Sequence, residues 1–329
     1  MNSSESGKTS KAAETGRGRQ AIAPWQIPWK GWQDILVRTY EQSNEDRLLA
    51  VAGGVVFYGL LALFPAITAM VSFYGLFAKP STISDHLAIA ADFLPADVLG
   101  IVKDQIDRVV AEGDAKLSIA FVSSFLLATW SANGGMKAVL DALNVFYQET
   151  ERRGFIRLNI VSLAFTFSGL FAVLVAIGSV VALPIVLSTV GLGGAGEVVL
   201  RVGRWPVLVA MILLGLATLY RFGPSRRKPR WRWITFGSLV ATVVWIAGSA
   251  LLSFYLTNYA NYDAMYGSLG AVIGMMSWMW MSTIVILFGA ELNSEIEHQT
   301  AKDSTDGDDM PMGTRGANVA DTVGKAMVK

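Results

Sequence analysis

Six long runs of this chain contain no Asp, Glu, Lys or Arg. They cover residues 48–78, 117–136, 158–196, 205–220, 233–262 and 264–290. A helix needs about 20 apolar residues, at about 1.5 Å rise each, to cross the hydrocarbon core of a bilayer. Five runs reach that length and the fourth comes close. The pattern predicts an all-α membrane protein with six transmembrane helices, at 50–77, 117–140, 159–187, 205–220, 233–256 and 269–290.

The distribution of Lys and Arg decides how the third and fourth runs are divided. The loop 148–158 carries three arginines and the loop 221–232 carries six basic residues, whereas 257–268 carries none. Basic loops stay on the cytoplasmic side of a membrane. Six spans with both termini in the cytoplasm place both basic loops inside. Splitting 158–196 into two helices would move 221–232 outside, so we expect one long helix kinked at Pro184.

Two segments outside the spans carry helical patterns. In 25–40, aromatic and apolar residues recur every three or four positions, which predicts a helix lying in the headgroup layer or packed against the inner mouth of the bundle. In 81–112, an apolar stripe with acidic residues between its members predicts a helical external hairpin between spans one and two. A soluble linker is the alternative for this second segment.

The polar ends of the chain differ from its middle. Residues 1–24 and 299–329 are rich in small and charged residues, which predicts disordered cytoplasmic tails around a membrane domain at 25–298. The first twenty residues contain no apolar core of a signal peptide. The whole chain is 53% hydrophobic and 16% charged, with a net charge of +1, whereas a soluble domain has roughly 25% charged residues.

Candidate chemistry in the spans is sparse. The chain has no cysteine and two histidines, both outside the apolar runs. This excludes disulfides, thiolate nucleophiles and Cys-ligated metals. We therefore expect no catalytic residue, no metal and no cofactor. Residues 191–196 match the letters G-x-G-x-x-G, but they lie between two spans rather than in a βαβ unit, and we interpret them as a turn.

A polar stripe on the second span is the strongest candidate site. Asn133, Lys137 and Asp141 recur every four residues and share one helix face. Polar groups at membrane depth are costly and mark pathways or bundle interiors. We expect a polar pathway lined by these three residues and by Tyr58 of the first span. The alternative is a structural Lys137–Asp141 ion pair near the cytoplasmic interface.

Two further groups of residues carry expectations. The first is a cytoplasmic charge cluster, in which Glu291 pairs with an arginine of the 148–158 loop; a solvated carboxylate at the helix end is equally compatible with the sequence. The second is a set of glycines that permit close helix packing. The cluster comprises Arg152, Arg153, Arg157 and Glu291, and the glycines are Gly134, Gly135, Gly270 and Gly274.

Three segments resemble the YihY/BrkB family of membrane proteins. They are AVAGGVVFYGLLALFPAI at 50–67, WSANGGMKAVLDALNVFYQETERR at 130–153, and the stretch 253–298 with its YGSLG, Trp-rich span and closing GAELN. The resemblance covers about 30–298. It implies a six-span protein of the bacterial inner membrane, some relatives of which were labelled ribonuclease BN while others are linked to envelope lipid export. It implies no catalytic motif.

Together these observations favour a transporter-like protein that moves or presents a lipid or another amphipathic envelope molecule. The chain has no Walker motif, so we expect that it has no ATPase activity of its own. The alternative is a membrane scaffold that anchors an envelope-biogenesis partner, and a membrane-bound ribonuclease is the third hypothesis. The expected partners are the bilayer, a lipid substrate, and a second copy or an envelope protein. The basic loops are explained by topology, so we expect no nucleic acid.

Overall fold

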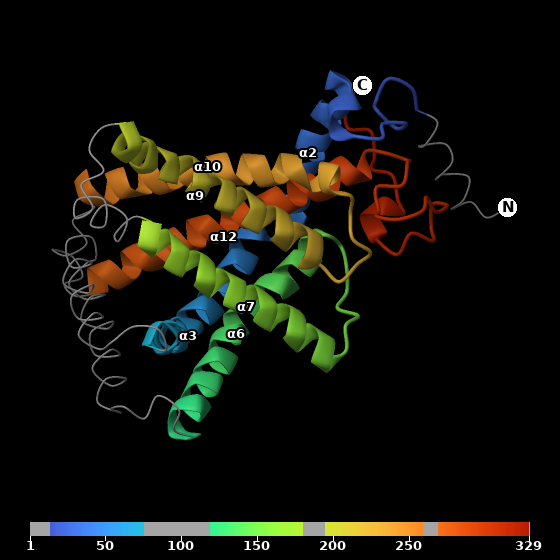
Figure 1. The fold of residues 1–329 in the computed structure, drawn as a ribbon. Coiled ribbons are helices and arrows are strands. Elements are labelled where there is room, and N and C mark those ends of the chain that lie inside the picture. Colours follow the sequence, from blue (N-terminus) through green and yellow to red (C-terminus); the bar gives the residue numbers. More distant parts are fainter. Residues whose placement is uncertain (1–13, 76–118, 180–194, 259–268, 329) are drawn as a thin grey trace.

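The computed structural model describes residues 14–75, 119–179, 195–258 and 269–328, and every long element in these ranges is a helix (Figure 1). The all-helical class is therefore confirmed for the described residues. The predicted external hairpin at 81–112 and Pro184 lie outside them. The seven helices are α2 (Trp29–Glu45), α3 (Leu48–Gly75), α6 (Ile119–Phe146), α7 (Phe155–Ile177), α9 (Ala195–Phe222), α10 (Trp231–Asn258) and α12 (Leu269–His298).

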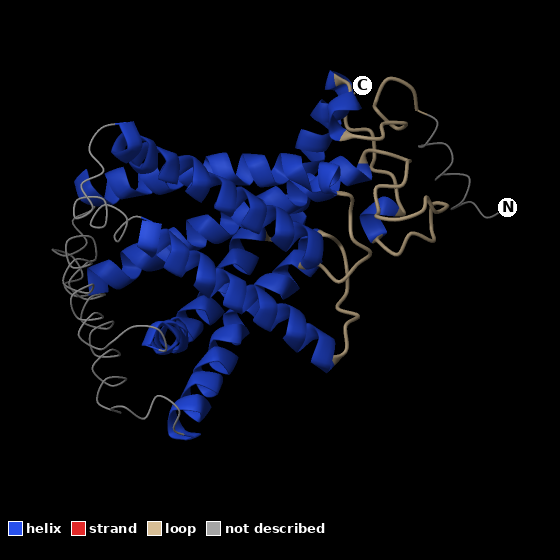
Figure 2. Cartoon of the chain, viewed as in Figure 1, coloured by secondary structure: helices blue, strands red, loops and turns tan. Residues whose placement is uncertain are grey.

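The helices form one bundle around α12. This helix packs against α10, α3, α2 and α6, while α3 packs on α6, α7 on α6, and α9 on α10. The loops 147–154 and 223–230 and the segments 14–28 and 299–328 gather at one end of the bundle, which we call the loop end (Figure 2). The two basic loops thus lie on the same side, as the predicted topology requires.

Among the described residues, four helical segments are long and apolar enough to cross a membrane. A fifth span results if α2 and the first part of α3, which meet at 58°, count as one broken span. The bend falls at Arg47, whose φ of 53° is in the left-handed region. The predicted spans 50–77 and 117–140 fall largely in α3 and α6, which are 28 residues each. The four segments that are long and apolar enough without α2 and α3 are Phe155–Ile177, Val202–Phe222, Trp231–Asn258 and Val272–His298.

The fourth predicted span is too short. The expected limits 205–220 mark where charges interrupt the apolar run, but α9 continues to Ala195 and contains Pro206. One interrupting charge is accommodated within the helix, because the Arg204 guanidinium lies 5.3 Å from the centroid of the Trp205 ring. A charged residue therefore ends the apolar run without ending the helix.

Helix α2 lies along the loop end with its two faces in different surroundings. Its aromatic face is open: Trp29 is 71% exposed and Tyr40 is 70% exposed. The opposite face buries Asp34, Ile35 and Arg38, and α2 packs against α12. Helix α2 can therefore pack on the bundle with one face while its aromatic face lies in a headgroup layer.

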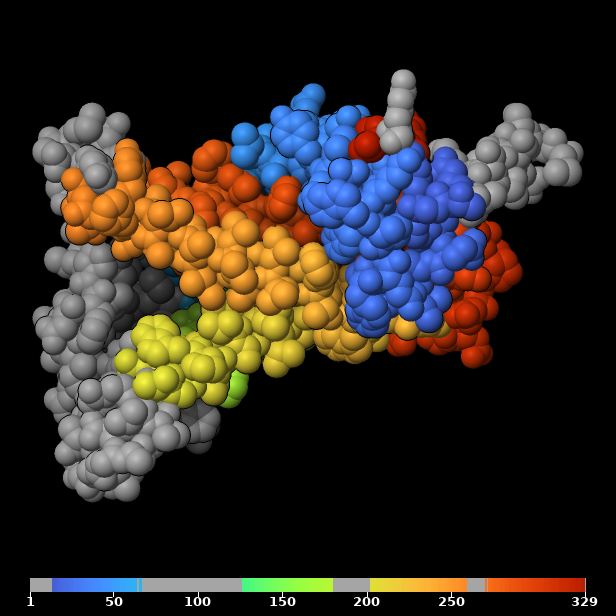
Figure 3. Space-filling model, turned by 90° about the horizontal axis from the view of Figure 1, so that it is seen from above, coloured from blue at the N-terminus to red at the C-terminus, as the bar shows by residue number. Residues whose placement is uncertain are grey.

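The C-terminal segment 299–328 differs from the predicted disordered tail. It folds back across the loop end and lies beside the N-terminal segment (Figure 3). Its acidic side chains pair with loop arginines, with Asp306 Oδ2 2.9 Å from Arg221 and Asp309 Oδ1 2.6 Å from Arg230. The backbone N–H of Asn318 donates to Glu149 Oε1. Because these partners lie far away in the sequence, a composition rich in Asp and Gly gives no sign of them.

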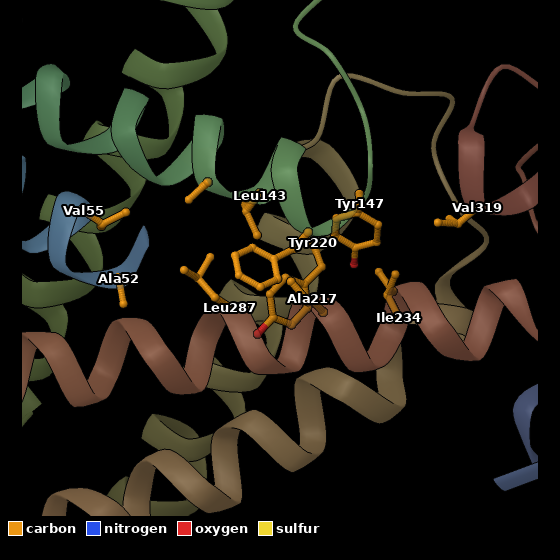
Figure 4. Packing of buried hydrophobic residues seen from close by; sticks show 12 residues of the cluster. Ala52, Val55, Leu143, Tyr147, Ala217, Tyr220, Ile234, Leu287 and Val319 are labelled. Carbon is orange, nitrogen blue, oxygen red and sulfur yellow. The ribbon is translucent and has the colours of Figure 1, made fainter. Parts of the chain in front are cut away.

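An apolar cluster at the centre of the bundle joins α3, α6, α9, α10 and α12 to the C-terminal segment (Figure 4). Tyr220 is fully buried there, and its hydroxyl donates to the carbonyl of Ile286 at 2.8 Å. Beside it α10 and α12 approach so closely that a Cβ on Gly289 would lie 2.7 Å from the Ala241 Cβ, and a Cβ on Gly237 would overlap the Gly289 carbonyl. These two glycines, rather than the predicted pair in the first turns of α12, set this helix contact.

The glycines predicted for packing have different surroundings. A Cβ on Gly135 would lie 3.1 Å from the Ala62 Cβ of α3, whereas one on Gly134 would meet no atom within 4 Å. A Cβ on Gly274 would make an ordinary contact of 3.7 Å with Leu256. Gly270 is buried. Of Gly134, Gly135 and Gly274, Gly135 is the one at a close helix contact, and the packing role of Gly270 stays a prediction.

The substitution Gly135→Leu is expected to destabilise the bundle by about 1–3 kcal/mol, because the new side chain must push α3 away from α6. Gly134→Leu is the matched control, one residue away and directed to open space. Thermal unfolding of the purified proteins in detergent measures the difference. Equal midpoints for the two variants would contradict the assigned α3–α6 contact.

Candidate functional site

Asn133 is the member of the predicted polar stripe that the structure buries. It is fully buried on α6, and its Oδ1 lies 3.2 Å from the Thr166 hydroxyl of α7. The same hydroxyl lies 2.9 Å from the Ser162 carbonyl, so it donates to one of the two acceptors. A polar contact thus joins α6 to α7 within two apolar helices.

The contact belongs to a longer row of buried polar side chains, which we call the polar seam. Thr129 and Asn133 share one face of α6, and three buried residues of α7 recur at spacings of three and four. Those three are Asn159, Ser162 and Thr166. Within the described part of the chain, Thr129 Oγ1, Asn133 Nδ2 and Asn159 Oδ1 have no hydrogen-bond partner. Buried polar atoms are rarely left so, and each such atom calls for an explanation.

The other predicted pathway residues lie outside the seam. Lys137 and Asp141 form no ion pair with each other in the described structure; the Lys137 Nζ instead lies 5.0 Å from the centroid of the Trp130 ring. Asp141 is exposed. Tyr58 is 53% exposed, with its ring edge-on to Phe57. The structure therefore brings Asn133 together with α7 residues, and not with Lys137, Asp141 and Tyr58.

The two basic loops are tied together at the loop end. Arg153 donates to both carboxylate oxygens of Glu151 and to the carbonyl of Gly223 in the other loop. The hydrogen bonds from Arg153 lower the pKa of Glu151 to about 2. Asn144 Oδ1 accepts from the backbone N–H of Ser225 at 2.7 Å.

A buried ion pair connects the second basic loop to α12. The guanidinium of Arg226 lies 2.6 Å from Glu297 Oε1, both side chains are fully buried, and the Tyr147 ring centroid lies 4.6 Å from the guanidinium. Glu297 also accepts from the Ser304 hydroxyl. Nothing in the sequence linked Arg226 to Glu297, which is 71 residues away.

Between the two loops lies a pocket of about 360 Å³, which we call the basic pocket. Seven of its lining residues are cationic, and three others are apolar. It is lined by Arg152, Arg153, Arg157, Val161, Arg221, Phe222, Pro224, Ser225, Arg226, Arg227, Lys228 and Gly316. The three predicted arginines of the charge cluster therefore do gather, together with the cations of 221–228 that the sequence explained by topology alone.

Glu291, the fourth predicted member of that cluster, lies elsewhere. It is fully buried in α12, and neither carboxylate oxygen has a hydrogen-bond partner among the described residues. The expected pairing with Arg152, Arg153 or Arg157 is absent from the described structure, where Glu149 and Glu151 are the partners of Arg152 and Arg153. A solvated helix-end carboxylate is excluded as well, since Glu291 is not exposed.

The described residues include no group of three or more His, Cys, Asp or Glu side chains that could hold a metal ion. What the arrangement offers instead is hydrogen bonding inside the bundle and positive charge at its loop end. Long apolar helices with these features define an all-helical membrane protein.

The comparisons with known proteins agree with this class. A family model described as virulence factor BrkB matches residues 39–312, and the chain belongs to this family. The ribonuclease-like protein YfkH of Bacillus subtilis (strain 168) is 31% identical over 248 residues, which cover 73% of this chain and 86% of that protein. A UPF0761 membrane protein of Cronobacter sakazakii is 26% identical over 281 residues, covering 83% and 91%. No solved structure matches.

The substitution Arg226→Met is expected to lower the stability by about 3–5 kcal/mol, because it leaves the Glu297 carboxylate buried without its cation. Arg157→Met is the control: this arginine is exposed and forms no ion pair in the described structure, so its loss is expected to change stability by less than about 0.5 kcal/mol. Chemical or thermal unfolding in detergent compares them. Equal stability of the two variants would contradict the buried pair.

The Glu151–Arg153 pair predicts a pH dependence. The pKa of Glu151 falls from 4.5 to about 2 on folding, so its contribution is complete above about pH 4.5 and is lost as the pH falls towards 2. Glu151→Gln is expected to cost less than about 1 kcal/mol at pH 7. This difference from wild type should shrink by pH 3, whereas the exposed control Glu41→Gln should show none at either pH. A Glu151 difference that is equal at pH 7 and pH 3 would contradict the assignment.

Proposed function

We propose that this BrkB-family membrane protein moves or presents a lipid, or another amphipathic envelope molecule, along the polar seam between α6 and α7. The observation that carries the proposal is the seam itself, with buried amide and hydroxyl groups from both helices and three polar atoms that have no partner in the described part of the chain. A permanently closed helix contact would gain by satisfying these atoms or replacing them with apolar groups. Their presence supports a contact that opens to admit a polar group.

The surroundings of the seam suit a lipid rather than a small polar solute. Apolar side chains on both helices point outwards, among them Leu127 of α6, 69% exposed, and Phe171 of α7, 62% exposed. When α6 and α7 separate, a headgroup can exchange its hydration for the amides and hydroxyls of the seam. The acyl chains can meanwhile stay against the apolar flanks in the bilayer.

The proposal places the protein in the bacterial inner membrane with six spans and both termini in the cytoplasm. The support is the concentration of Lys and Arg at the loop end, where the basic loops meet the described segments next to both termini. The exposed aromatic face of α2 lies at the same end, where Trp and Tyr side chains suit a headgroup layer.

Lipid movement in proteoliposomes tests the proposal. A phospholipid with a fluorescent acyl chain is followed between leaflets by chemical quenching, with empty vesicles as the baseline. Wild type is expected to exceed the baseline, and Asn133→Leu/Thr166→Val to fall to it, because the seam becomes apolar. The matched control is Ser238→Ala/Thr242→Val, which removes two buried hydroxyls of α10 that bond to their own helix.

Movement by wild type equal to that of empty vesicles would remove autonomous lipid movement and leave a scaffold as the better account. Equal movement by the seam variant and wild type would remove the seam from the path. The Bacillus relative is named a ribonuclease-like protein, so the purified chain is also incubated with RNA. Cleavage that survives repurification would replace the lipid proposal.

A further inference from the structure

The basic pocket holds more positive charge than its neighbours neutralise. Seven cationic side chains line it. Four of them have a carboxylate partner: Arg152 with Glu149, Arg153 with Glu151, Arg221 with Asp306, and Arg226 with Glu297. Among the described residues, the other three, Arg157, Arg227 and Lys228, form no ion pair. The pocket therefore favours an anion.

Two of the paired cations are buried, while two cations without an ion pair among the described residues are exposed. Arg153 and Arg226 have nearly or fully buried side chains fixed by their carboxylates. Arg227 is held by the C-terminal segment, because it donates to the carbonyls of Asp306 and Asp308. Arg157 and Lys228 are exposed at the rim. The Lys228 Nζ lies 4.7 Å from the centroid of the Phe222 ring, which also lines the pocket. Buried guanidinium groups together with exposed cations suit a compact anion with several acceptor oxygens, such as a phosphate.

The position of the pocket indicates that this phosphate belongs to a membrane lipid. It opens beside the first turns of α7 and the last turn of α9, two helices capable of spanning a membrane. Its lining includes the apolar side chains of Val161, Phe222 and Pro224. Next to it, Phe155 and Ile156 are 72% and 74% exposed, at the level where a bilayer surface would meet α7. An anion seated here would carry its apolar part along these side chains.

We propose that the basic pocket binds the phosphate of an anionic phospholipid headgroup. Its volume falls within the range of about 300–1,000 Å³ that is typical of small-ligand sites. Basic pockets between membrane helices hold anionic headgroups through the same charge attraction. The assignment rests on the proposed function, because a lipid supplies the phosphate. To that function it adds the charge of the lipid headgroup and the site that binds it.

Binding is measured on the full-length protein in a neutral detergent, by titrating phosphatidylglycerol that carries a fluorophore on one acyl chain. The variant Arg157→Gln/Lys228→Gln removes two free cations without breaking an ion pair of the described structure. It is expected to bind at least about tenfold more weakly, given about one kcal/mol per basic residue at an anionic surface. Lys30→Gln/Lys325→Gln removes the same charge from exposed positions away from the pocket and is expected to bind like wild type.

Comparison with other ligands distinguishes a lipid phosphate from other sources of phosphate. Phosphatidylcholine with the same fluorophore is expected to bind more weakly than phosphatidylglycerol, and inorganic phosphate at the concentration of the lipid is expected not to displace it. Displacement by inorganic phosphate at that concentration would overturn the assignment to a lipid. Tighter binding of a single-stranded RNA would overturn it in favour of a nucleic acid. Equal loss of binding in the pocket and control variants would show general charge attraction and overturn the site.

This experiment separates the two proposals because it measures binding alone. Selective binding that depends on Arg157 and Lys228, with no lipid movement in vesicles, would refute the proposed function and leave the pocket assigned. Lipid movement that depends on Asn133, with unchanged binding by the pocket variant, would refute the pocket and leave the proposed function in place.

Discussion

Two buried ion pairs on the last turns of α12 hold the loop end together. Glu295 lies 2.5 Å from Arg38 of α2, and Glu297 lies 2.6 Å from Arg226 of the 223–230 loop. Charges this deeply buried are tolerated only when each has its partner, because desolvation costs several kcal/mol per ion. The pairs therefore fix the position of α2 and of the second basic loop against the central helix. The C-terminal segment then contacts both pairs: the Lys325 backbone carbonyl accepts a hydrogen bond from Arg38, and the Ser304 hydroxyl donates one to Glu297.

This anchoring explains how a strongly basic surface can be well ordered. Arginines that pair with Glu151 and Glu297 repel one another less, and among the described residues Arg157 and Lys228 line the same pocket without an ion pair. The polar seam follows a different rule. Its groups lie in an apolar surrounding, and among the described residues three of their polar atoms have no hydrogen-bond partner. The proposed function therefore combines a loop end held by buried ion pairs with an α6–α7 contact that opens.

The sequence predicted the features that depend on local pattern. Runs without charge located α3, α6, α10 and α12, and the spacing of Asn133 placed it on a polar face. Features that depend on distant partners were missed. The order of 299–328 comes from pairs such as Asp306–Arg221, and the close contact of α10 with α12 comes from Gly237 and Gly289, which share no short motif. Counting charges shows where they lie and not what neutralises them, which is why Glu291 was assigned to the wrong neighbours.

A reversible cross-link across the polar seam tests the central claim most directly. The natural chain has no cysteine, so Asn133→Cys/Thr166→Cys adds the two thiols alone, at side chains 3.2 Å apart. Unlike Leu and Val, the reduced thiols keep a weak donor and acceptor at both positions, so the reduced form is expected to move lipid, more slowly than wild type. In proteoliposomes, oxidation is expected to stop this movement by locking α6 to α7, and reduction to restore it. Each single-cysteine variant should respond to neither treatment. Equal lipid movement in the oxidised and reduced forms, with the disulfide verified, would contradict a path that opens between these helices.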